Sequence, residues 1–400
     1  MNLYSDAPFW LMRHGIVNSY PSLSSNLSVE VAVMGAGISG VLVADALCKK
    51  GYDVTILDRR HAGTGSTAAS TSLLQYEIDT PLHKLIRMVG QKYATRSYEL
   101  CRKAIYDVET LCRPFKDPDL FALKPSFQFA SYQSHVTPLA KEFELRRQNG
   151  FRLKWMEQKD IFNKFGFKKP AGILSEDGAE ANAYKLTHRL LEKNIQRGLN
   201  IFDNTEIVHI THHKKGVALH AKNGNKIKAR KLVIACGYES QQYIPQKVQD
   251  LNATYAIASE PFNAKKFWFR NSLIWETAMP YLYLRTTGDN RIIIGGKDVP
   301  FSNPNRRDHL LQRKAKALEE AFSKLFPSLG FKTDFKWAGT FASSKDGLPY
   351  IGSIRQLPHT YFALAFGGNG VTFSMIAAQI IADLITGQKN EDAEIFKFDR

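Results

Sequence analysis

Hydrophobic and polar residues alternate along this 400-residue chain in short runs that predict strands interleaved with helices. The clearest case lies near the N-terminus. Three β-forming residues begin the run VAVMGAGISG over 31–40, and a helix-like pattern with apolar residues at Val41, Ala44 and Leu47 follows. That helix ends near Gly51, and a second strand is predicted over 52–57. The order strand, glycine turn, helix, strand is typical of a nucleotide-binding α/β unit.

The same periodicities predict further elements along the rest of the chain. Helices are expected over 81–113, 184–197, 306–326 and 373–385, and strands over 127–129, 205–210, 217–221, 231–237, 256–258, 281–285, 291–296 and 361–364. Residues 1–28 show no clear period but contain several aromatic side chains, which is unusual for a disordered tail. We therefore expect them to form an arm packed on the body of the protein.

The glycines of the first turn form the pattern G-x-G-x-x-G. In such a motif Gly35 permits the turn, Gly37 lets a diphosphate approach bare backbone, and Gly40 lets helix and strand pack closely. The N–H groups of the following helix point at the phosphates. Asp58 ends the second strand 18 residues past Gly40, at a distance suited to an adenosine ribose. These residues predict a dinucleotide site whose ribose carries no 2′-phosphate.

Three later segments add small or hydroxyl-bearing residues that fit against a flat cofactor. They are the run over 63–72, the end of the buried strand at 235–237, and FGGNGVT over 366–372. The last precedes a helix that is apolar nearly all round, so its first N–H groups need a partner. A helix N-terminus there would stabilise the negative charge of a reduced flavin. A dehydrogenase that uses only NAD is disfavoured, because this glycine-rich helix start would then have no purpose.

Composition and charge narrow the functional class. The chain carries 54 Lys and Arg against 38 Asp and Glu, a formal net charge of +16, but the basic residues occur in scattered pairs. This pattern favours a solvated surface or attraction of anionic substrates over a nucleic-acid partner or an acidic membrane. Four cysteines without metal-ligand spacing fit a reducing compartment and predict no metal site. No signal peptide or membrane span is recognised, so a cytoplasmic protein is expected.

Taken together, these motifs make the chain similar to the FAD-dependent amine and amino-acid oxidoreductases of the D-amino-acid oxidase (DAO) superfamily. The matching pieces, in order, are VAVMGAGISG, Asp58, GTGSTAAS, DGAEANAYKL, VIACG, YLYLR with IIIGG, DGLPYIG and FGGNGVTFS. The resemblance implies an α/β fold, with a Rossmann-like FAD-binding domain interleaved with an α+β substrate domain built on an antiparallel sheet. It also implies hydride transfer from the carbon beside a nitrogen to flavin N5, with reoxidation by O2 or another electron acceptor.

On this basis the chain divides into an N-terminal arm (1–28), a discontinuous FAD-binding domain (29–113, 171–245 and 337–400) and a substrate domain (114–170 and 246–336). The expected cofactor-binding residues are Gly35, Gly37, Ile38, Ser39, Gly40, Asp58, Arg59, Ser66, Thr67, Ala68, Val208, Ala235, Gly237, Gly367, Gly368, Asn369, Gly370, Val371 and Thr372. The candidates for the substrate pocket are Gln75, Tyr281, Tyr283, Arg285 and Phe341.

Departures from the family pattern bear on the substrate. Phe341 stands at or near the place of a carboxylate-binding arginine of amino-acid-oxidising relatives, and Thr372 stands where sarcosine oxidase has a carboxylate-binding lysine. An apolar ring cannot replace a guanidinium. Either the substrate is an amine without an α-carboxylate, or another cation such as Arg285 binds the acid. Gly65-Ser66-Thr67 is not followed by histidine and no cysteine lies beyond Cys236, so the FAD is expected to be non-covalent.

No general base is assignable from the sequence. Tyr281, Tyr283 and Glu276 are candidates by position only. The leading hypothesis is FAD-dependent oxidation of a small amine or amino acid. The alternatives are a flavoenzyme that modifies an aminomethyl group on tRNA, and a non-catalytic flavin-binding regulatory protein.

Overall fold

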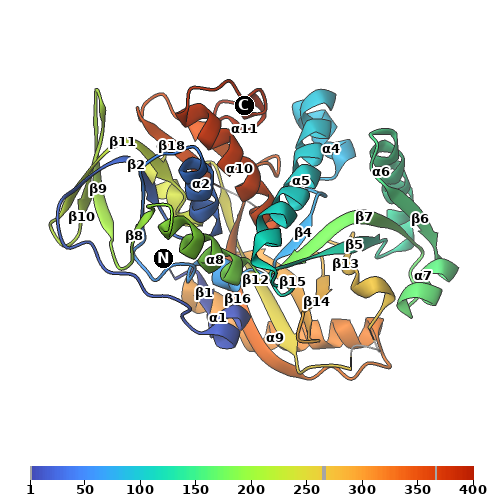
Figure 1. The fold of residues 1–400 in the computed structure, drawn as a ribbon. Coiled ribbons are helices and arrows are strands. Elements are labelled where there is room, and N and C mark those ends of the chain that lie inside the picture. The colour runs from blue at the N-terminus through green and yellow to red at the C-terminus, as the bar shows by residue number, and fades with distance from the viewer. Residues whose placement is uncertain (1, 264–266, 365–366) are drawn as a thin grey trace.

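Two β-sheets joined by several chain crossings form the body of the protein in this computed structural model, which describes residues 2–263, 267–364 and 367–400 (Figure 1). One sheet has eight strands and the other has ten. One large hydrophobic core lies around the eight-stranded sheet and a second lies between the ten-stranded sheet and its covering helix, and the N-terminal arm adds a smaller cluster against the ten-stranded sheet. The mixed α/β architecture expected from the sequence is confirmed.

The eight-stranded sheet is built around the first predicted strand, β2 (Leu27–Met34). Its order is β17 (Tyr350–Ser353), β18 (Thr360–Leu364), β11 (Lys226–Ile234), β2, β3 (Val54–Leu57) and β8 (Asn200–Phe202), and β9 (Ile207–His213) and β10 (Gly216–Ala221) extend from β11. The pairs from β18 to β8 are parallel. Because the carboxyl ends of parallel strands lie at one edge, the ends of β2, β3 and β11 meet there, as in a Rossmann-like unit.

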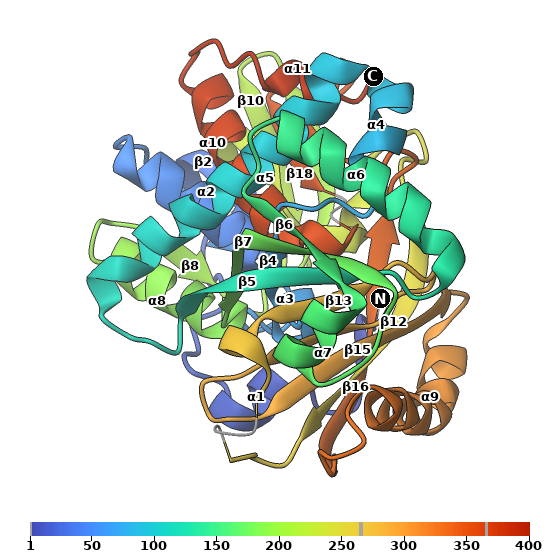
Figure 2. The ribbon, with the colours of Figure 1, turned by 90° about the vertical axis from the view of Figure 1, so that its right-hand side faces the viewer.

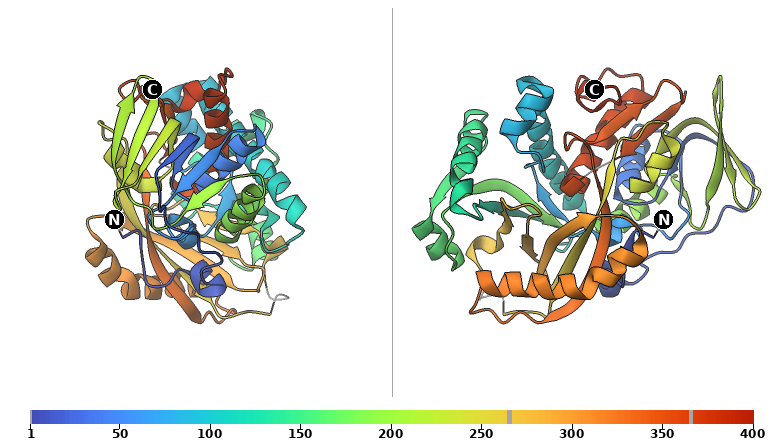
Figure 3. Two further views of the ribbon diagram at one scale, coloured as in Figure 1. Left: turned by 60° about the vertical axis from the view of Figure 1, so that its left-hand side comes forward. Right: turned by 180° about the vertical axis from the view of Figure 1, so that it is seen from behind.

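The ten-stranded sheet is mostly antiparallel. Its order is β1 (Tyr4–Ser5), β16 (Thr333–Ser343), β12 (Asp250–Ser259), β15 (Ile292–Pro300), β14 (Tyr283–Thr286), β13 (Leu273–Glu276), β5 (Phe121–Phe129), β7 (Ala171–Ala181) and β4 (Leu73–Gln75), with β6 (Leu153–Glu157) paired to β7. Helix α9 (Pro304–Leu325) lies along one side of this sheet (Figure 3). Its apolar stripe, including Leu311, Leu318 and Phe322, fills the second core.

The other helices pack against the two sheets and against one another (Figure 2). The α-helices are α1 (Phe9–His14), α2 (Ile38–Lys49), α3 (Ser66–Ala69), α4 (Leu82–Val89), α5 (Gln91–Cys112), α6 (Val136–Gln148), α7 (Gln158–Phe165), α8 (Ala183–Ile195), α10 (Gly370–Ile385) and α11 (Ala393–Phe396). Short 3-10 turns lie at Arg113–Phe115, Gln133–His135, Gly237–Tyr243, Phe269–Asn271 and Gly367–Asn369. The helical run expected over 81–113 is broken at Gly90, whose φ of 83° ends α4.

The N-terminal arm packs on the body, as its aromatic content indicates. Strand β1 pairs with β16, and α1 buries Phe9 and Trp10 in a small cluster with Trp337. The Trp10 indole N–H donates to the carbonyl of Ser70, 2.7 Å away. The arm therefore closes over the loop that follows α3.

Strand pairing also bears on the domain division, which remains a proposal. Strand β7 lies between β5 and β4 in the ten-stranded sheet, and β16 continues in that sheet to Ser343. On pairing alone, the second FAD-binding segment would begin after Ala181 and the third after Ser343.

The helical segment Gly367–Ile385 has the length and composition of a membrane-crossing helix, but 67% of its most apolar window is buried inside the fold. Length and composition alone are weak evidence for a span.

Candidate flavin and substrate site

A backbone cradle forms where β2, β3 and β11 end. Gly35 has a φ of 108°, and a Cβ there would lie 2.5 Å from the carbonyl oxygen of Ala235. A Cβ on Gly40 would lie 1.9 Å from the carbonyl oxygen of Gly35. Gly37 is the residue before α2, and Ile38 donates its N–H to the Thr67 hydroxyl across 3.0 Å. Only glycine fits at Gly35 and Gly40, and the contact from Thr67 orients the start of the helix.

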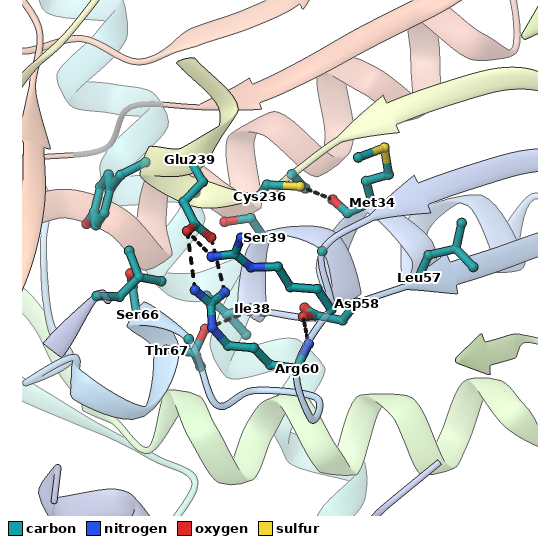
Figure 4. Close-up of a pocket in the computed structure, with 18 of the residues that line it drawn as sticks. Met34, Ile38, Ser39, Leu57, Asp58, Arg60, Ser66, Thr67, Cys236 and Glu239 are labelled. Atoms are coloured by element: carbon teal, nitrogen blue, oxygen red, sulfur yellow. Dashed lines mark hydrogen bonds and ion pairs between the residues drawn. The ribbon is translucent and has the colours of Figure 1, made fainter. Parts of the chain in front are cut away.

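This cradle opens into an elongated cavity (Figure 4). Its lining residues come from the ends of the parallel strands, from α3 and from the start of α10: Leu3, Met34, Gly35, Gly37, Ile38, Ser39, Leu57, Asp58, Arg59, Arg60, Gly65, Ser66, Thr67, Ser70, Thr205, Glu206, Ile207, Ala235, Cys236, Gly237, Tyr238, Glu239, Gln242, Tyr243, Gly370, Val371 and Ser374. The site thus joins parts of the chain that lie more than three hundred residues apart.

Asp58 lies at the end of β3 and its carboxylate is held by backbone. Oδ2 accepts the N–H of Ala36 across 2.7 Å, and Oδ1 accepts the N–H of Arg60 across 2.8 Å. Burial raises the pKa of Asp58, against the lowering effect of these two hydrogen bonds. The carboxylate is therefore fixed in direction at the end of the cavity where the motif predicts a ribose.

Glu239 closes the same end of the cavity and was not expected from the sequence. Its carboxylate accepts hydrogen bonds from both Arg59 and Arg60, with Arg60 Nη1 3.1 Å from Oε2 (Figure 4). Burial acts to raise the pKa of Glu239, but the hydrogen bond from Arg60 and the charges of Arg60 and Arg59, among other contributions, together lower the pKa. Both arginines are thus paired with a carboxylate of this chain.

A second cavity continues from the first, because both share Leu3, Ser66, Ser70, Tyr238, Gly370 and Val371. The residues that line only the second are Ala69, Thr71, Ser72, Leu73, Gln75, Thr254, Ala256, Tyr281, Tyr283, Asp298, Trp337, Gly339, Thr340, Phe341, Gly367 and Gly368. It lies between the ten-stranded sheet and the start of α10. Among these described lining residues there is no lysine, arginine or histidine.

Hydrogen bonds tie the turn before α10 to this second cavity. The Tyr281 hydroxyl donates to Asp79 Oδ1 and the Gly368 N–H donates to Asp79 Oδ2, each across 2.9 Å. The Asn369 amide donates to the carbonyls of Gln75 and Glu77, at 3.0 and 2.9 Å. The turn at Gly367–Asn369 is thereby tied to Tyr281 in the wall of the second cavity.

Most of the predicted site residues meet in these two cavities. Gly35, Gly37, Ile38, Ser39, Asp58, Arg59, Ser66, Thr67, Ala235, Gly237, Gly370 and Val371 line the first, and Gln75, Tyr281, Tyr283, Phe341, Gly367 and Gly368 line the second, along with Ser66, Gly370 and Val371. Four further predicted residues are buried but line neither cavity: Gly40, Ala68, Asn369 and Thr372. Val208 lies elsewhere and is 60% exposed, whereas its neighbour Ile207 lines the first cavity.

Arg285 lines neither cavity. It is buried, and its Nη1 donates to the carbonyls of Thr71, Ser72 and Ala181 at 3.0, 3.0 and 2.8 Å. Burial lowers its pKa, and Glu180 at 3.7 Å partly offsets this. Its donors hold neighbouring backbone together and do not face a ligand. Glu276 is similarly engaged, accepting from the Ser131 hydroxyl at 2.8 Å.

Asp298, which was not expected from the sequence, is the acidic residue among the described residues that line the second cavity. Burial raises its pKa to about 6. Its Oδ1 is buried and has no hydrogen-bond partner within the described ranges 2–263, 267–364 and 367–400. Asp298 therefore brings a carboxylate to the space beside the α10 turn, and one oxygen of that carboxylate accepts no hydrogen bond from the described residues.

The described residues fit FAD. The bare backbone at Gly35 and Gly37 accepts a diphosphate, Asp58 suits an unphosphorylated ribose, and the joined cavities lead from there to a wall of tyrosines. The N-terminus of α10 opens onto both cavities through Gly370 and Val371.

Known proteins agree with this reading. The chain is 23% identical to a putative Rieske 2Fe-2S iron-sulfur protein of Bacillus subtilis, covering 94% of this chain and 72% of that protein. It is 22% identical to the gamma-glutamylputrescine oxidoreductase of Escherichia coli, covering 94% and 87%. The crystal structure of L-proline dehydrogenase from P. horikoshii shares the fold, with a TM-score of 0.79 at 18% identity over 93% of this chain and 97% of that one. Residues 30–384 match the model of the FAD dependent oxidoreductase family, DAO. The chain therefore belongs to the FAD-dependent oxidoreductases of the DAO family.

Proposed function

We propose that this oxidoreductase acts on the C–N bond of a small amine that lacks an α-carboxylate. The observation that carries the proposal is the second cavity, which adjoins the flavin cradle and has no cation among its described lining residues. When bound, FAD supplies the hydride acceptor at N5, and O2 or another acceptor reoxidises it. One relative is named for gamma-glutamylputrescine, a compound that contains an amine, and this name supports oxidation of an amine by this chain.

An α-carboxylate would find no cationic partner among the described residues that line this cavity. Buried carboxylates are bound by arginine or lysine, and a carboxylate left without such a partner loses its hydration without compensation. Phe341, which stands at or near the place of the family arginine, lines this cavity beside Thr340. Arg285 has its donors directed at backbone carbonyls. An amino acid is therefore a poorer substrate for this wall than an amine.

The residues of the chain have separable tasks in this scheme. Tyr281, Tyr283 and Phe341 present ring surface that excludes water from the reacting carbon. The N-terminus of α10 at Gly370 places a positive dipole end where negative charge develops on the cofactor. The Asp79 bonds to Tyr281 and Gly368 keep these two parts at a fixed separation.

The test is anaerobic reduction of the purified holoenzyme. Its yellow absorbance should bleach with primary or secondary alkylamines, and α-amino acids of the same carbon skeleton should bleach it much more slowly. Matched pairs such as ethylamine with alanine, and pyrrolidine with proline, differ only by a carboxylate on the carbon beside nitrogen. Bleaching by the amino acids alone would contradict the absence of an α-carboxylate, and no bleaching by any compound would contradict the catalytic role.

A further inference from the structure

A β-bulge shapes the wall of the second cavity. Strands β12 and β15 pair Tyr255 with Gly296 and Ala253 with Val299, so that two residues of β15 face the single residue Thr254. The first of them, Lys297, has a φ of 59°, in the left-handed region. A bulge of this kind adds one residue to one strand and turns its side chains over.

The bulge decides which way Asp298 faces. Earlier in β15, Ile292 and Ile294 pack in the core beneath α9, while Ile293 packs on the opposite face. Regular alternation would send Asp298 to the α9 side with Ile294. The extra residue instead puts it on the cavity side, where Thr254 also lies.

Few groups offset the negative charge of the Asp298 carboxylate there. Thr254 lines the same cavity and acts to lower the pKa of Asp298. Lys314, the cation that acts on it electrostatically, donates its ammonium to the Lys297 carbonyl across 2.7 Å. Oδ1 of Asp298 has no partner within the part of the chain that the structure describes. A buried carboxylate in this state is costly for a fold unless a ligand supplies the counter-charge.

We propose that Asp298 is the residue that binds the ammonium group of the substrate and thereby selects cationic amines over zwitterionic and anionic compounds. This inference rests on the proposed function for the assignment of the second cavity as the substrate site. Tyr281 and Tyr283 line the same cavity, and their ring faces favour a cation beside the carboxylate. The chain thus selects its substrate by an anion placed on a strand bulge.

The test measures binding without turnover. Propyltrimethylammonium is a permanent cation that cannot be oxidised as an amine, and butanoate is an anion of similar size. Each is titrated into the holoenzyme, and the change in the flavin spectrum gives its Kd. The wild type should bind the cation more tightly than butanoate. Asp298→Asn should weaken cation binding by about ten-fold or more, since it removes the counter-charge.

Two further variants complete the comparison. Asp250→Asn makes the same change at an exposed position of β12, and it should bind the cation as the wild type does. Asp298→Glu keeps the charge and should retain most of the affinity, which also serves if Asp298→Asn does not fold. Equal cation affinity in Asp298→Asn and the wild type, or tighter binding of butanoate than of the cation, would overturn the inference.

The two proposals fail separately. If amines bleach the flavin but Asp298→Asn binds the cation normally, the function stands and the role of Asp298 falls. If the cation binds in an Asp298-dependent way but no amine bleaches the flavin, the recognition stands and the proposed function falls.

Discussion

Tyr281 and Asp79 join the substrate wall to the flavin side of the site. The Tyr281 hydroxyl donates to Asp79 Oδ1 across 2.9 Å, while Asp79 Oδ2 accepts the N–H of Gly368. Burial raises the pKa of Tyr281 well above its ordinary value, so the hydroxyl stays protonated and remains the donor. One carboxylate therefore couples a strand of the ten-stranded sheet to the turn that begins α10.

Breaking this bridge should have graded effects. Tyr281→Phe removes one donor and should lower the free energy of unfolding of the holoenzyme by about 1 kcal/mol. Asp79→Ala removes the acceptor of both donors and should cost about 2–3 kcal/mol and weaken FAD retention. Urea titrations and flavin release on dilution measure both. Tyr283→Phe is the matched control, because its hydroxyl lies 3.5 Å from Thr254 and makes no such bridge. Equal losses in the two tyrosine variants would contradict the coupling.

Gly35→Ala should abolish the flavin site. Its Cβ would lie 2.5 Å from the Ala235 carbonyl oxygen and its φ is positive, so the substitution should cost at least about 2 kcal/mol and push β2 and β11 apart. The purified protein should lack the yellow colour. Gly330→Ala, where a Cβ meets nothing within 4 Å, should keep it. A yellow Gly35→Ala protein would mean that the cradle is elsewhere.

Arg285→Met should reduce stability and leave substrate choice unchanged. The change removes the donor from three backbone carbonyls and should lower the free energy of unfolding by about 2–4 kcal/mol. Steady-state assays of the folded variant should give a KM for amines close to that of the wild type. Arg230→Met, at an arginine that is 77% exposed, should leave the stability nearly unchanged. A large KM increase without loss of stability would instead support the carboxylate-binding role considered from the sequence.

The stability of the wild type should depend on pH through Asp298. An unfolded aspartate ionises near pH 4, whereas burial raises the pKa of Asp298 to about 6, with Asp79 raising it further and Thr254 and Lys314 lowering it. The folded state holds the proton more tightly, so this group lowers the free energy of unfolding as pH rises from about 4 to about 6. Above that window, Asp298→Asn should be more stable than the wild type by on the order of 2 kcal/mol. Below it, the two should converge.

Thermal melts of the apoprotein at several pH values test this dependence. Asp250→Asn should show no such difference, because that carboxylate is exposed and pairs with Lys247. A constant gap between Asp298→Asn and the wild type at every pH would contradict the assignment.

Acid precipitation should release the FAD from the protein in unmodified form. Cys236 lines the first cavity, but its Sγ–H donates to the Met34 carbonyl. Burial also raises the pKa of its thiol, so Cys236 is a poor nucleophile. Yellow supernatant after precipitation is the expected result, and flavin that stays with the pellet would contradict it.

The sequence predicted the cofactor end of the site better than the substrate end. The glycines of the cradle and Asp58 are fixed by local geometry that a short motif encodes. Val208 was expected to bind the cofactor, but it is 60% exposed, and its neighbour Ile207, the first residue of β9, lines the first cavity. Successive side chains of a strand point to opposite faces, and a short motif does not reveal which face meets the cofactor.

The residues that were missed depend on non-local structure. Asp298 reaches the cavity only because of the bulge at Lys297, which alternation along a strand does not reveal. Glu239 lies just past the buried strand β11, and its partners Arg59 and Arg60 follow β3, so only the folded sheet brings them together. Arg285 looked like a pocket cation because strand position alone does not show that backbone carbonyls surround it.

The pairing of β1 with β16 has a consequence for how the molecule comes into being. Tyr4 lies opposite Gly339, and Leu3 lines both cavities, so residues made early wait for a strand made more than three hundred residues later. Strand β2 likewise has β3 close behind it but meets β11 only after about half the chain has been made. Contacts this distant in sequence form slowly, and an unfinished chain exposes an open edge of β2. The flavin cradle needs the ends of β2 and β11 and the start of α10 together, so FAD can bind only after all three segments have been made.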